Sequence, residues 1–123
     1  MMNNRDNLIS IIVPCYNEEH AIPYFYKAIT EHSTLMKNEF GVDFEYLFIN
    51  DGSVDNTLTV LKEYANKDNR VKYISFSRNF GKESAMYAGL KNASGNYIAI
   101  MDADLQDPPY LLTEMYKTII ESD

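Results

Sequence analysis

The stretch Leu8-Ile9-Ser10-Ile11-Ile12-Val13 is short, almost wholly apolar and rich in β-branched side chains, which is typical of a buried β-strand. Residues 45–49, 71–76 and 97–101 have the same character. Apolar residues run through these segments almost without interruption, which indicates strands that are buried on both faces. Such strands belong to a parallel sheet that is covered by helices on both sides.

Segments with helical periodicity separate these strands. The apolar residues of each segment recur at intervals of three, four or seven and so define one buried face of a helix. These faces are Ile22, Phe25, Ile29 and Met36; Leu58, Leu61 and Ala65; Met86, Leu90 and Ala93; and Leu112, Met115 and Ile119. Four β-α units in a row predict an α/β protein with a Rossmann-like, doubly wound, mostly parallel sheet.

The composition is that of one folded domain. The 123 residues are 46% hydrophobic and 24% charged, and no repeat or low-complexity linker divides them. We expect residues 1–7 to be flexible and residues 8–123 to form the domain. With a net charge of −7, the chain lacks the excess of positive charge that binds a phosphate backbone, so we expect no nucleic-acid partner.

The apolar runs are too short to span a bilayer, and the polar N-terminus lacks the apolar core of a signal peptide. A single cysteine, Cys15, excludes an internal disulfide and fits a reducing compartment. These features predict a cytoplasmic location. We expect Cys15 to be a packed small residue rather than a nucleophile, because neither His20 nor His32 has a telling spacing from it.

In doubly wound sheets the ligand crevice lies beyond the carboxyl ends of the strands, so the residues that follow each strand are the site candidates. The first strand is followed by Pro14-Cys15-Tyr16-Asn17-Glu18-Glu19. Asn17 could cap the next helix, with the two glutamates near its positive end. Alternatively the segment forms a pocket wall in which Tyr16 stacks on a planar ring.

The second strand is followed by Asn50-Asp51-Gly52-Ser53-Val54-Asp55. Gly52 permits a left-handed turn, and Ser53 or Asp55 can cap the following helix. Turn chemistry does not explain Asp51, an acid at the end of an apolar strand. Its carboxylate could accept hydrogen bonds from a base or from a ribose hydroxyl, so Asp51 is a site candidate.

The third strand is followed by Ser77-Arg78-Asn79-Phe80-Gly81-Lys82-Glu83. Gly81 lets the backbone approach a ligand, and Arg78 and Lys82 offer positive charge beside a helix N-terminus. These features suit an anion, although the spacing is not that of a P-loop.

The fourth strand is followed by three carboxylates within six residues: Asp102, Asp104 and Asp107. Their mutual repulsion, about a few kcal/mol, must be offset. If the strand continues, Asp102 and Asp104 share a face and can converge on Mg²⁺ or Mn²⁺. The alternative is a solvated acidic turn, and Asp107 is a natural N-cap before Pro108.

Together these segments resemble the family 2 glycosyltransferases, whose nucleotide-sugar-binding domain has the GT-A fold. The matching stretches are Val13-Pro14-Cys15-Tyr16-Asn17-Glu18, Asn50-Asp51-Gly52-Ser53-Val54-Asp55 and Asp102-Ala103-Asp104. Residues 77–83 and 101–109 are similar to the subgroup that transfers a sugar to a polyprenyl phosphate, such as dolichyl or undecaprenyl phosphate. Two positions depart from the pattern: Asn50, where many relatives have Asp, and Tyr110, where the subgroup often has Glu.

The resemblance implies a role for each matching position. Pro14, Tyr16 and Glu18 would line the nucleoside pocket, and Asp51 would hydrogen-bond the base. Arg78, Asn79 and Lys82 would lie near the nucleotide. Asp102 and Asp104 would be the D-x-D pair, with Asp104 the ligand of Mg²⁺ or Mn²⁺ and Asp102 reaching ribose or metal. The donor would be a nucleotide-diphosphate sugar, with UDP-sugars the leading candidates, and transfer would be inverting.

Family members have a catalytic domain roughly twice as long as this chain, and the subgroup adds membrane helices after it. We therefore expect 8–123 to be the donor-binding half of an enzyme, without the acceptor site and catalytic base, and inactive by itself. The longer enzyme would lie at the cytoplasmic face of a membrane. A four-stranded sheet cut from a larger one would expose an edge strand and an apolar patch, which predicts self-association, such as a homodimer.

Two other classes remain as alternatives. A non-catalytic module could bind a nucleotide and a metal without transferring a sugar. A response-regulator receiver domain is also doubly wound, but it requires an acidic pair after its first strand and a Lys after its fifth. Here Pro14-Cys15-Tyr16-Asn17 follows the first strand, and a fifth strand is missing from the pattern.

Overall fold

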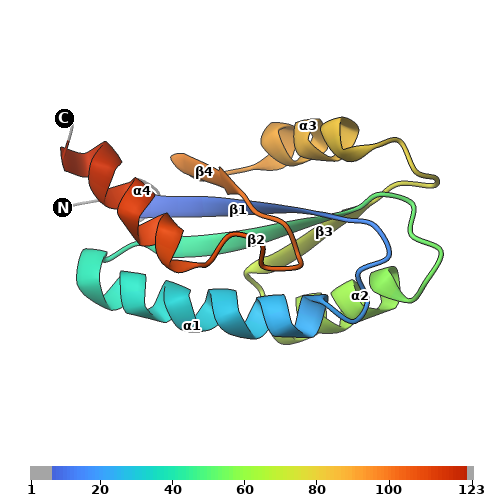
Figure 1. The fold of residues 1–123 in the computed structure, drawn as a ribbon, viewed down its shortest axis with the longest axis horizontal. Helices are drawn as coiled ribbons and strands as arrows, with labels where there is room; N and C mark the ends of the chain where they lie inside the picture. The colour runs from blue at the N-terminus through green and yellow to red at the C-terminus, as the bar shows by residue number, and fades with distance from the viewer. Residues whose placement is uncertain (1–6, 122–123) are drawn as a thin grey trace.

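The computed structural model describes residues 7–121. Strands and helices alternate along the chain (Figure 1). The elements are β1 (Leu8–Cys15), α1 (Ile22–Phe40), β2 (Asp43–Asn50), α2 (Thr57–Lys67), β3 (Val71–Ser75), α3 (Lys82–Asn92), β4 (Tyr97–Ile100) and α4 (Tyr110–Glu121). Flexibility was predicted for residues 1–7. Of these, all but Asn7 lie outside the described residues.

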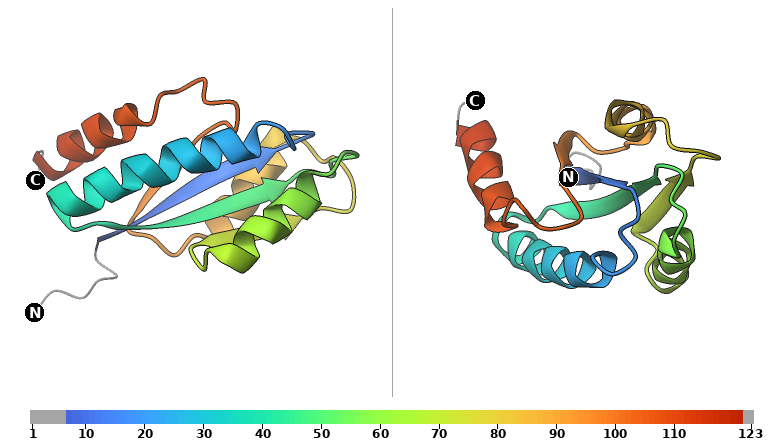
Figure 2. Two further views of the ribbon diagram at one scale, coloured as in Figure 1. Left: turned by 90° about the horizontal axis from the view of Figure 1, so that it is seen from below. Right: turned by 45° about the vertical axis from the view of Figure 1, so that its right-hand side comes forward.

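The four strands form one sheet in the order β3-β2-β1-β4, and every neighbouring pair is parallel. Helix α3 covers one face, whereas α1, α2 and α4 lie on the other (Figures 1 and 2). The predicted doubly wound α/β fold is therefore confirmed. The chain leaves β1 towards β2 on one side and later returns to β4 on the other, so the strand order reverses between β1 and β4.

The alternation of side chains along β1 divides the core into two layers. Ile9, Ile11 and Val13 belong to the larger cluster, on the side of α1 and α4, whereas Ile12 packs with Ala85 of α3 on the opposite face. Both sets are almost completely buried. This two-sided burial explains why the strand sequence is nearly continuous in apolar residues.

Helix α1 has the buried face that its sequence predicts, since Ile22, Phe25, Ile29 and Met36 are all buried. The helix ends at Gly41, which has a φ of 72° and donates its N–H to the carbonyl oxygen of Lys37 at 2.8 Å. A left-handed residue after the last turn is the usual way to satisfy the final carbonyls, and glycine adopts that conformation without strain.

Helix α3 does not bury the face that was predicted. Leu90 is exposed and Met86 only half-buried, whereas Ala85 and Gly89 face the sheet. A Cβ atom on Gly89 would lie 2.4 Å from Cγ2 of Ile12, so the helix approaches the sheet too closely for larger side chains. Hydrophobic periodicity missed this face because alanine and glycine carry little apolar signal.

The faces predicted for α2 and α4 are correct only in part. In α2, Leu61 is buried together with Thr57. In α4, Leu112 is buried but Met115 is 55% exposed, and the second buried residue is Tyr116. The ring of Tyr116 makes edge contacts with those of Phe40 and Tyr97, so aromatic packing sets the rotation of this helix.

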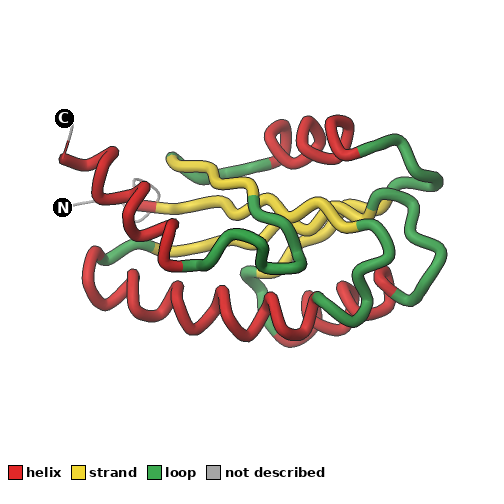
Figure 3. Tube along the Cα trace, viewed as in Figure 1, coloured by secondary structure: helices red, strands yellow, loops and turns green. Residues whose placement is uncertain are grey.

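Strand β4 forms one edge of the sheet (Figure 3). Helix α3 packs on β1 and β2, so Ile98 and Ile100 of β4 remain 43% and 37% exposed. Leu111 and Met115 of α4 are also exposed and line a hollow with Ile100 beside this strand. We call these four residues the β4-edge surface. Within residues 7–121, no helix combines the length and the apolar character needed to cross a bilayer.

Candidate functional site

A pocket of about 440 Å³ opens at the carboxyl ends of the strands. All four strand-to-helix connections contribute to it, as the topology requires. Its lining residues are Pro14, Cys15, Tyr16, Glu18, Asp51, Asn79, Gly81, Lys82 and Asp102. Every residue proposed from the sequence is therefore brought to one pocket except Arg78 and Asp104, which are not among those that line it.

The connection after β1 is held against the one after β2 by Asn17. The side-chain oxygen of Asn17 accepts hydrogen bonds from the backbone N–H of Val54 at 2.9 Å and of Asp55 at 3.4 Å. Its own N–H donates to Oγ of Ser53 at 2.9 Å. Asn17 has a φ of 54°, a conformation that asparagine tolerates better than most residues.

The predicted capping role of Asn17 is therefore wrong, because α1 begins five residues later, at Ile22. Ser53 does not cap α2 either, since its hydroxyl accepts the hydrogen bond from Asn17. Asp55 does serve α2: its Oδ1 accepts hydrogen bonds from the N–H and the hydroxyl of Thr57, at 2.9 and 2.5 Å. Burial opposes ionisation of Asp55, but these hydrogen bonds leave its pKa below the ordinary value.

Asp51 holds the connection after β3. The carboxylate is 4% exposed, and its Oδ1 accepts hydrogen bonds from the N–H of Phe80 at 2.7 Å and of Gly81 at 3.3 Å. Its Oδ2 accepts hydrogen bonds from the N–H of Gly81 at 3.0 Å and from Nδ2 of Asn79 at 3.1 Å. These three donor groups fill most of the roughly four acceptor sites that a carboxylate offers.

This role of Asp51 was not predicted from the sequence, where only contacts with a ligand were expected. One signal was available: Asp51 directly follows β2, Gly81 lies in the connection that follows β3, and neighbouring parallel strands bring such connections to the same edge of the sheet. Gly52 completes the junction. It has a φ of 67°, and a Cβ atom there would lie 2.1 Å from the backbone carbon of Arg78.

Lys82 and Asp102 face each other across the pocket. The ammonium of Lys82, the first residue of α3, donates to Oδ1 of Asp102 at 2.8 Å, and this contact raises the pKa of Lys82. The side chains are 59% and 33% exposed, so solvent has access to the pair. Lys82 is the one cation among the residues that line the pocket.

Strand β4 ends at Ile100, and a turn follows at residues 103–104. The premise that the strand continues through Asp102 and Asp104 is therefore wrong. Asp102 is half-buried, whereas Asp104 is exposed and accepts hydrogen bonds from the backbone N–H and the side-chain amide of Gln106, at 3.4 and 3.0 Å. Both carboxylates are reached by solvent, although Asp102 is paired with Lys82 and Asp104 with Gln106.

The acidic residues nevertheless influence one another. Glu18 has a raised pKa, first because it is partly buried and then because of the negative charges of Asp104, Asp55 and Asp102. Residues 7–121 contain no group of three or more histidine, cysteine or acidic side chains arranged to hold a metal. A hard cation with one or two carboxylate ligands, completed by water and phosphate oxygens, fits this donor set.

Tyr16 and Arg78 occupy the rim of this region. Tyr16 is 47% exposed, which leaves its ring accessible to a planar partner. Arg78 is exposed, and its guanidinium lies over the ring of Phe80, 4.9 Å from the centroid. Arg78 is therefore engaged with its own loop rather than directed into the pocket.

Cys15 lines the pocket, but its thiol is buried and donates to the carbonyl oxygen of Val13. Burial, together with the charges of Glu18 and Asp55, raises the pKa of Cys15 well above its ordinary value. A thiol in this state is a packed residue and not a nucleophile, as predicted. His20 is exposed, whereas His32 is partly buried and hydrogen-bonds with the hydroxyl of Thr113 in α4 at 2.7 Å.

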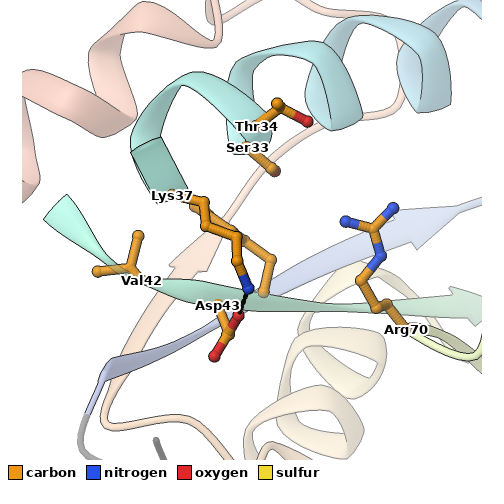
Figure 4. Close-up of a pocket in the computed structure, with 7 residues that line it drawn as sticks. Ser33, Thr34, Lys37, Val42, Asp43 and Arg70 are labelled. Atoms are coloured by element: carbon orange, nitrogen blue, oxygen red, sulfur yellow. Dashed lines mark hydrogen bonds and ion pairs between the residues drawn. The ribbon is translucent and has the colours of Figure 1, made fainter. Parts of the chain in front are cut away.

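A second cavity, of about 250 Å³, lies at the opposite end of the sheet, between the end of α1 and the start of β2 (Figure 4). Lys37 and Arg70 line it, but Lys37 is paired with Asp43 and Arg70 with Asp68. Because it lies far from the strand-to-helix connections, this cavity is not the candidate site.

A parallel, doubly wound sheet with a pocket at its strand order reversal places this chain among the α/β proteins that bind ligands, nucleotides included, at that point. Glycosyl transferase family 2 matches residues 10–123 of this chain, and the chain belongs to that family. A bactoprenol glucosyl transferase of Shigella phage SfV is 49% identical over 100 residues, which cover 81% of this chain and 31% of the phage protein. The uncharacterized glycosyltransferase YkcC of Bacillus subtilis is 48% identical over 106 residues, or 86% of this chain and 32% of that protein.

Solved structures agree with this assignment. S. aureus TarS 1–349 in complex with UDP-GlcNAc has a TM-score of 0.70 at 29% identity, over 92% of this chain and 31% of TarS. The mannosyltransferase PcManGT of Pyrobaculum calidifontis, in complex with GDP-Man and Mn²⁺, has a TM-score of 0.72 at 22% identity, over 92% of this chain and 32% of PcManGT. The fold is thus that of the GT-A glycosyltransferases. The chain spans about a third of the length of the curated relatives it matches.

Proposed function

We propose that this chain forms the donor-binding part of a glycosyltransferase that takes a sugar from a nucleotide diphosphate, with a UDP-sugar as donor. The observation that carries the proposal is that seven predicted site residues, from four separate connections, line one pocket at the strand order reversal. The similarity to TarS, which was solved with UDP-GlcNAc, supports a UDP-sugar.

The pocket offers a separate place to each part of such a donor. The exposed ring of Tyr16 stacks on the base, and Pro14 and Glu18 form the wall beside the nucleoside. Asn79 and Lys82 would lie near the diphosphate, and Arg78 would reach it only by leaving the ring of Phe80. The hydrogen bond that the carboxylate of Asp51 would accept from the base stays a prediction. The contacts of Asp51 support a second role, that of holding residues 79–81 in place.

Asp102 and Asp104 are the residues that would hold Mg²⁺ or Mn²⁺. Their hard oxygen atoms suit such a cation. Burial first, and then the negative charges of Asp104, Asp55 and Asp102, raise the pKa of Glu18, and a bound cation would neutralise part of that charge. When bound, the cation would stabilise the negative charge of the departing nucleotide diphosphate. The transfer itself is proposed to be inverting, and we assign no catalytic base among the described residues.

We further propose that the acceptor is a polyprenyl phosphate, because bactoprenol glucosyl transferases are among the relatives. This acceptor would place the longer enzyme at the cytoplasmic face of a membrane. Residues 8–123 would then form the donor-binding half, which by itself binds the donor without transferring the sugar. The β4-edge surface, apolar and at a sheet edge, would pair with a second copy of the chain.

Calorimetric titration with UDP, with and without Mn²⁺, tests the donor site. We expect binding that depends on Mn²⁺ and is lost in Asp104→Ala, whereas the matched variant Asp107→Ala, in the same acidic segment, binds as the unaltered chain does. Binding that is equally strong without Mn²⁺ would overturn the metal assignment. A complete lack of UDP binding in the presence of Mn²⁺ would overturn the donor site.

A further inference from the structure

The ion pair between Lys82 and Asp102 joins the two residues on which a charged donor would depend most. The ammonium lies 2.8 Å from Oδ1 of a carboxylate that is assigned to the metal in the proposed function. A close ammonium weakens the binding of a divalent cation at the same carboxylate oxygen, because the two positive charges repel. The contact seen here and metal binding at that oxygen are therefore competing arrangements.

The position of Lys82 in α3 gives a second, independent observation. Lys82 is the first residue of this helix, where the backbone dipole favours negative charge and disfavours a cation. A lysine at this place needs an anionic partner from elsewhere in the molecule or from a ligand. In the present structure Asp102 supplies that partner, and a diphosphate near the same helix end would supply another.

The other groups around the pocket strengthen the argument. Glu18 and Asp51 line it as well, so Lys82 is the one positive side chain among several acids. Asp51 fixes the backbone of Phe80 and Gly81, directly before Lys82, and so holds the start of the lysine side chain in place. The long and exposed side chain can still swing about this fixed point.

We propose that Lys82 is a resident counterion of Asp102 that is exchanged when the donor binds. Without a ligand, the ammonium neutralises Asp102 and competes with divalent cations. When the metal and the nucleotide diphosphate arrive together, Asp102 passes to the metal and Lys82 passes to the diphosphate. This inference rests on the proposed function and adds a consequence to it: metal and nucleotide bind cooperatively, because each frees a partner for the other.

The test is the affinity for Mn²⁺ alone, measured by the electron paramagnetic resonance signal of free Mn²⁺, in the full chain and in Lys82→Met. Removing the competitor should strengthen Mn²⁺ binding about three-fold, the scale of an exposed ion pair. Lys82→Arg, which retains the charge, should bind Mn²⁺ as the unaltered chain does. Lys91→Met, in the last turn of the same helix, is the matched control and should also leave the affinity unchanged.

The same variants should also change the coupling between ligands. In Lys82→Met, the factor by which UDP tightens Mn²⁺ binding should fall, because the lysine no longer gains a phosphate partner. If Lys82→Met fails to fold, as judged by circular dichroism, Lys82→Gln replaces it. Unchanged or weaker Mn²⁺ binding in the neutral variant, or no Mn²⁺ binding in either chain, overturns the exchange. Failure of the unaltered chain to bind UDP with Mn²⁺ overturns the donor site instead, so the two failures are distinguishable.

Discussion

Oδ1 of Asp51 lies 2.7 Å from the backbone N–H of Phe80, which is 29 residues further along the chain. Through this contact and those to Gly81 and Asn79, the carboxylate at the end of β2 holds the connection that follows β3. A charged acceptor that binds two backbone N–H groups in a buried position is among the stronger hydrogen-bonding arrangements in proteins. Asp51 therefore shapes the pocket whether or not it touches a ligand.

Asp51→Asn should lower the free energy of unfolding by about 2 kcal/mol, because an amide removes the charge and turns an NH₂ group towards backbone donors. Urea denaturation followed by circular dichroism measures this change. Asp107→Asn, an exposed acid, should leave the unfolding midpoint unaltered. If Asp51→Asn keeps the midpoint of the unaltered chain but loses affinity for UDP, the carboxylate acts on the ligand directly and not through the loop.

Gly52→Ala should destabilise the chain by more than about 3 kcal/mol, since the new methyl group would overlap backbone atoms of Arg78 and Asn79. Gly41→Ala is the matched control. Gly41 has a similar φ of 72°, but a Cβ atom there would meet nothing within 4 Å. The free energy of unfolding of the control should fall by only about 1 kcal/mol, the cost of a left-handed backbone at a residue other than glycine. Equal losses in urea denaturation would show that the contact with residues 78–79 is unimportant.

Asp68 should make the stability depend on pH in the acid range. Hydrogen bonds from Arg70, and one from the hydroxyl of Tyr26, lower the pKa of Asp68 from 3.8 to about 2. A carboxyl group with a lowered pKa in the folded state stabilises the protein above its unfolded pKa. That stability is lost as the pH falls from about 4 towards 2. The loss should be about 1 to 2 kcal/mol, because Arg70 is 42% exposed.

Urea denaturation between pH 5 and pH 2.5 checks this prediction for the unaltered chain and for Asp68→Asn. The difference in stability between the two should shrink as the pH falls. Glu45, whose pKa is also lowered by its hydrogen bonds despite burial, titrates in both chains and cancels in the difference. The stability of Glu63→Gln, a substitution at an exposed position of α2, should depend on pH in the same way as that of the unaltered chain. A constant difference for Asp68→Asn would contradict the assigned pKa.

The β4-edge surface should mediate self-association. Sedimentation velocity at increasing concentration should show dimers of the unaltered chain, and Ile98→Lys should weaken dimerisation about ten-fold, because it buries a charge at the contact. Val54→Lys provides the control, since Val54 is 85% exposed in the connection between β2 and α2. A chain that stays monomeric at the highest concentration, or equal effects of both variants, would remove the surface as a dimer contact.

Parts of the fold could be predicted because they depend on local pattern. Periodicity alone predicts that the continuous apolar strands are buried on both faces. It also predicts the buried face of a helix such as α1, whose apolar residues run along its full length. The face of α3 could not be predicted in this way, because its contact with Ile12 depends on the small size of Ala85 and Gly89 and not on their hydrophobicity. Tyr116 was missed for a related reason: its burial depends on the rings of Phe40 and Tyr97, which come from distant parts of the chain.

By itself, the sequence determined the order of strands and helices, the parallel sheet and the edge at which a ligand would bind. Those features follow from side-chain periodicity and from the rule that parallel strands end on one side. Only the tertiary structure decided what Asn17, Asp51 and Lys82 contact, since their partners are 20 to 38 residues distant in the chain. Such hydrogen bonds form where the packing of the strands brings donors and acceptors together. A local sequence pattern does not predict which of these distant groups will pair.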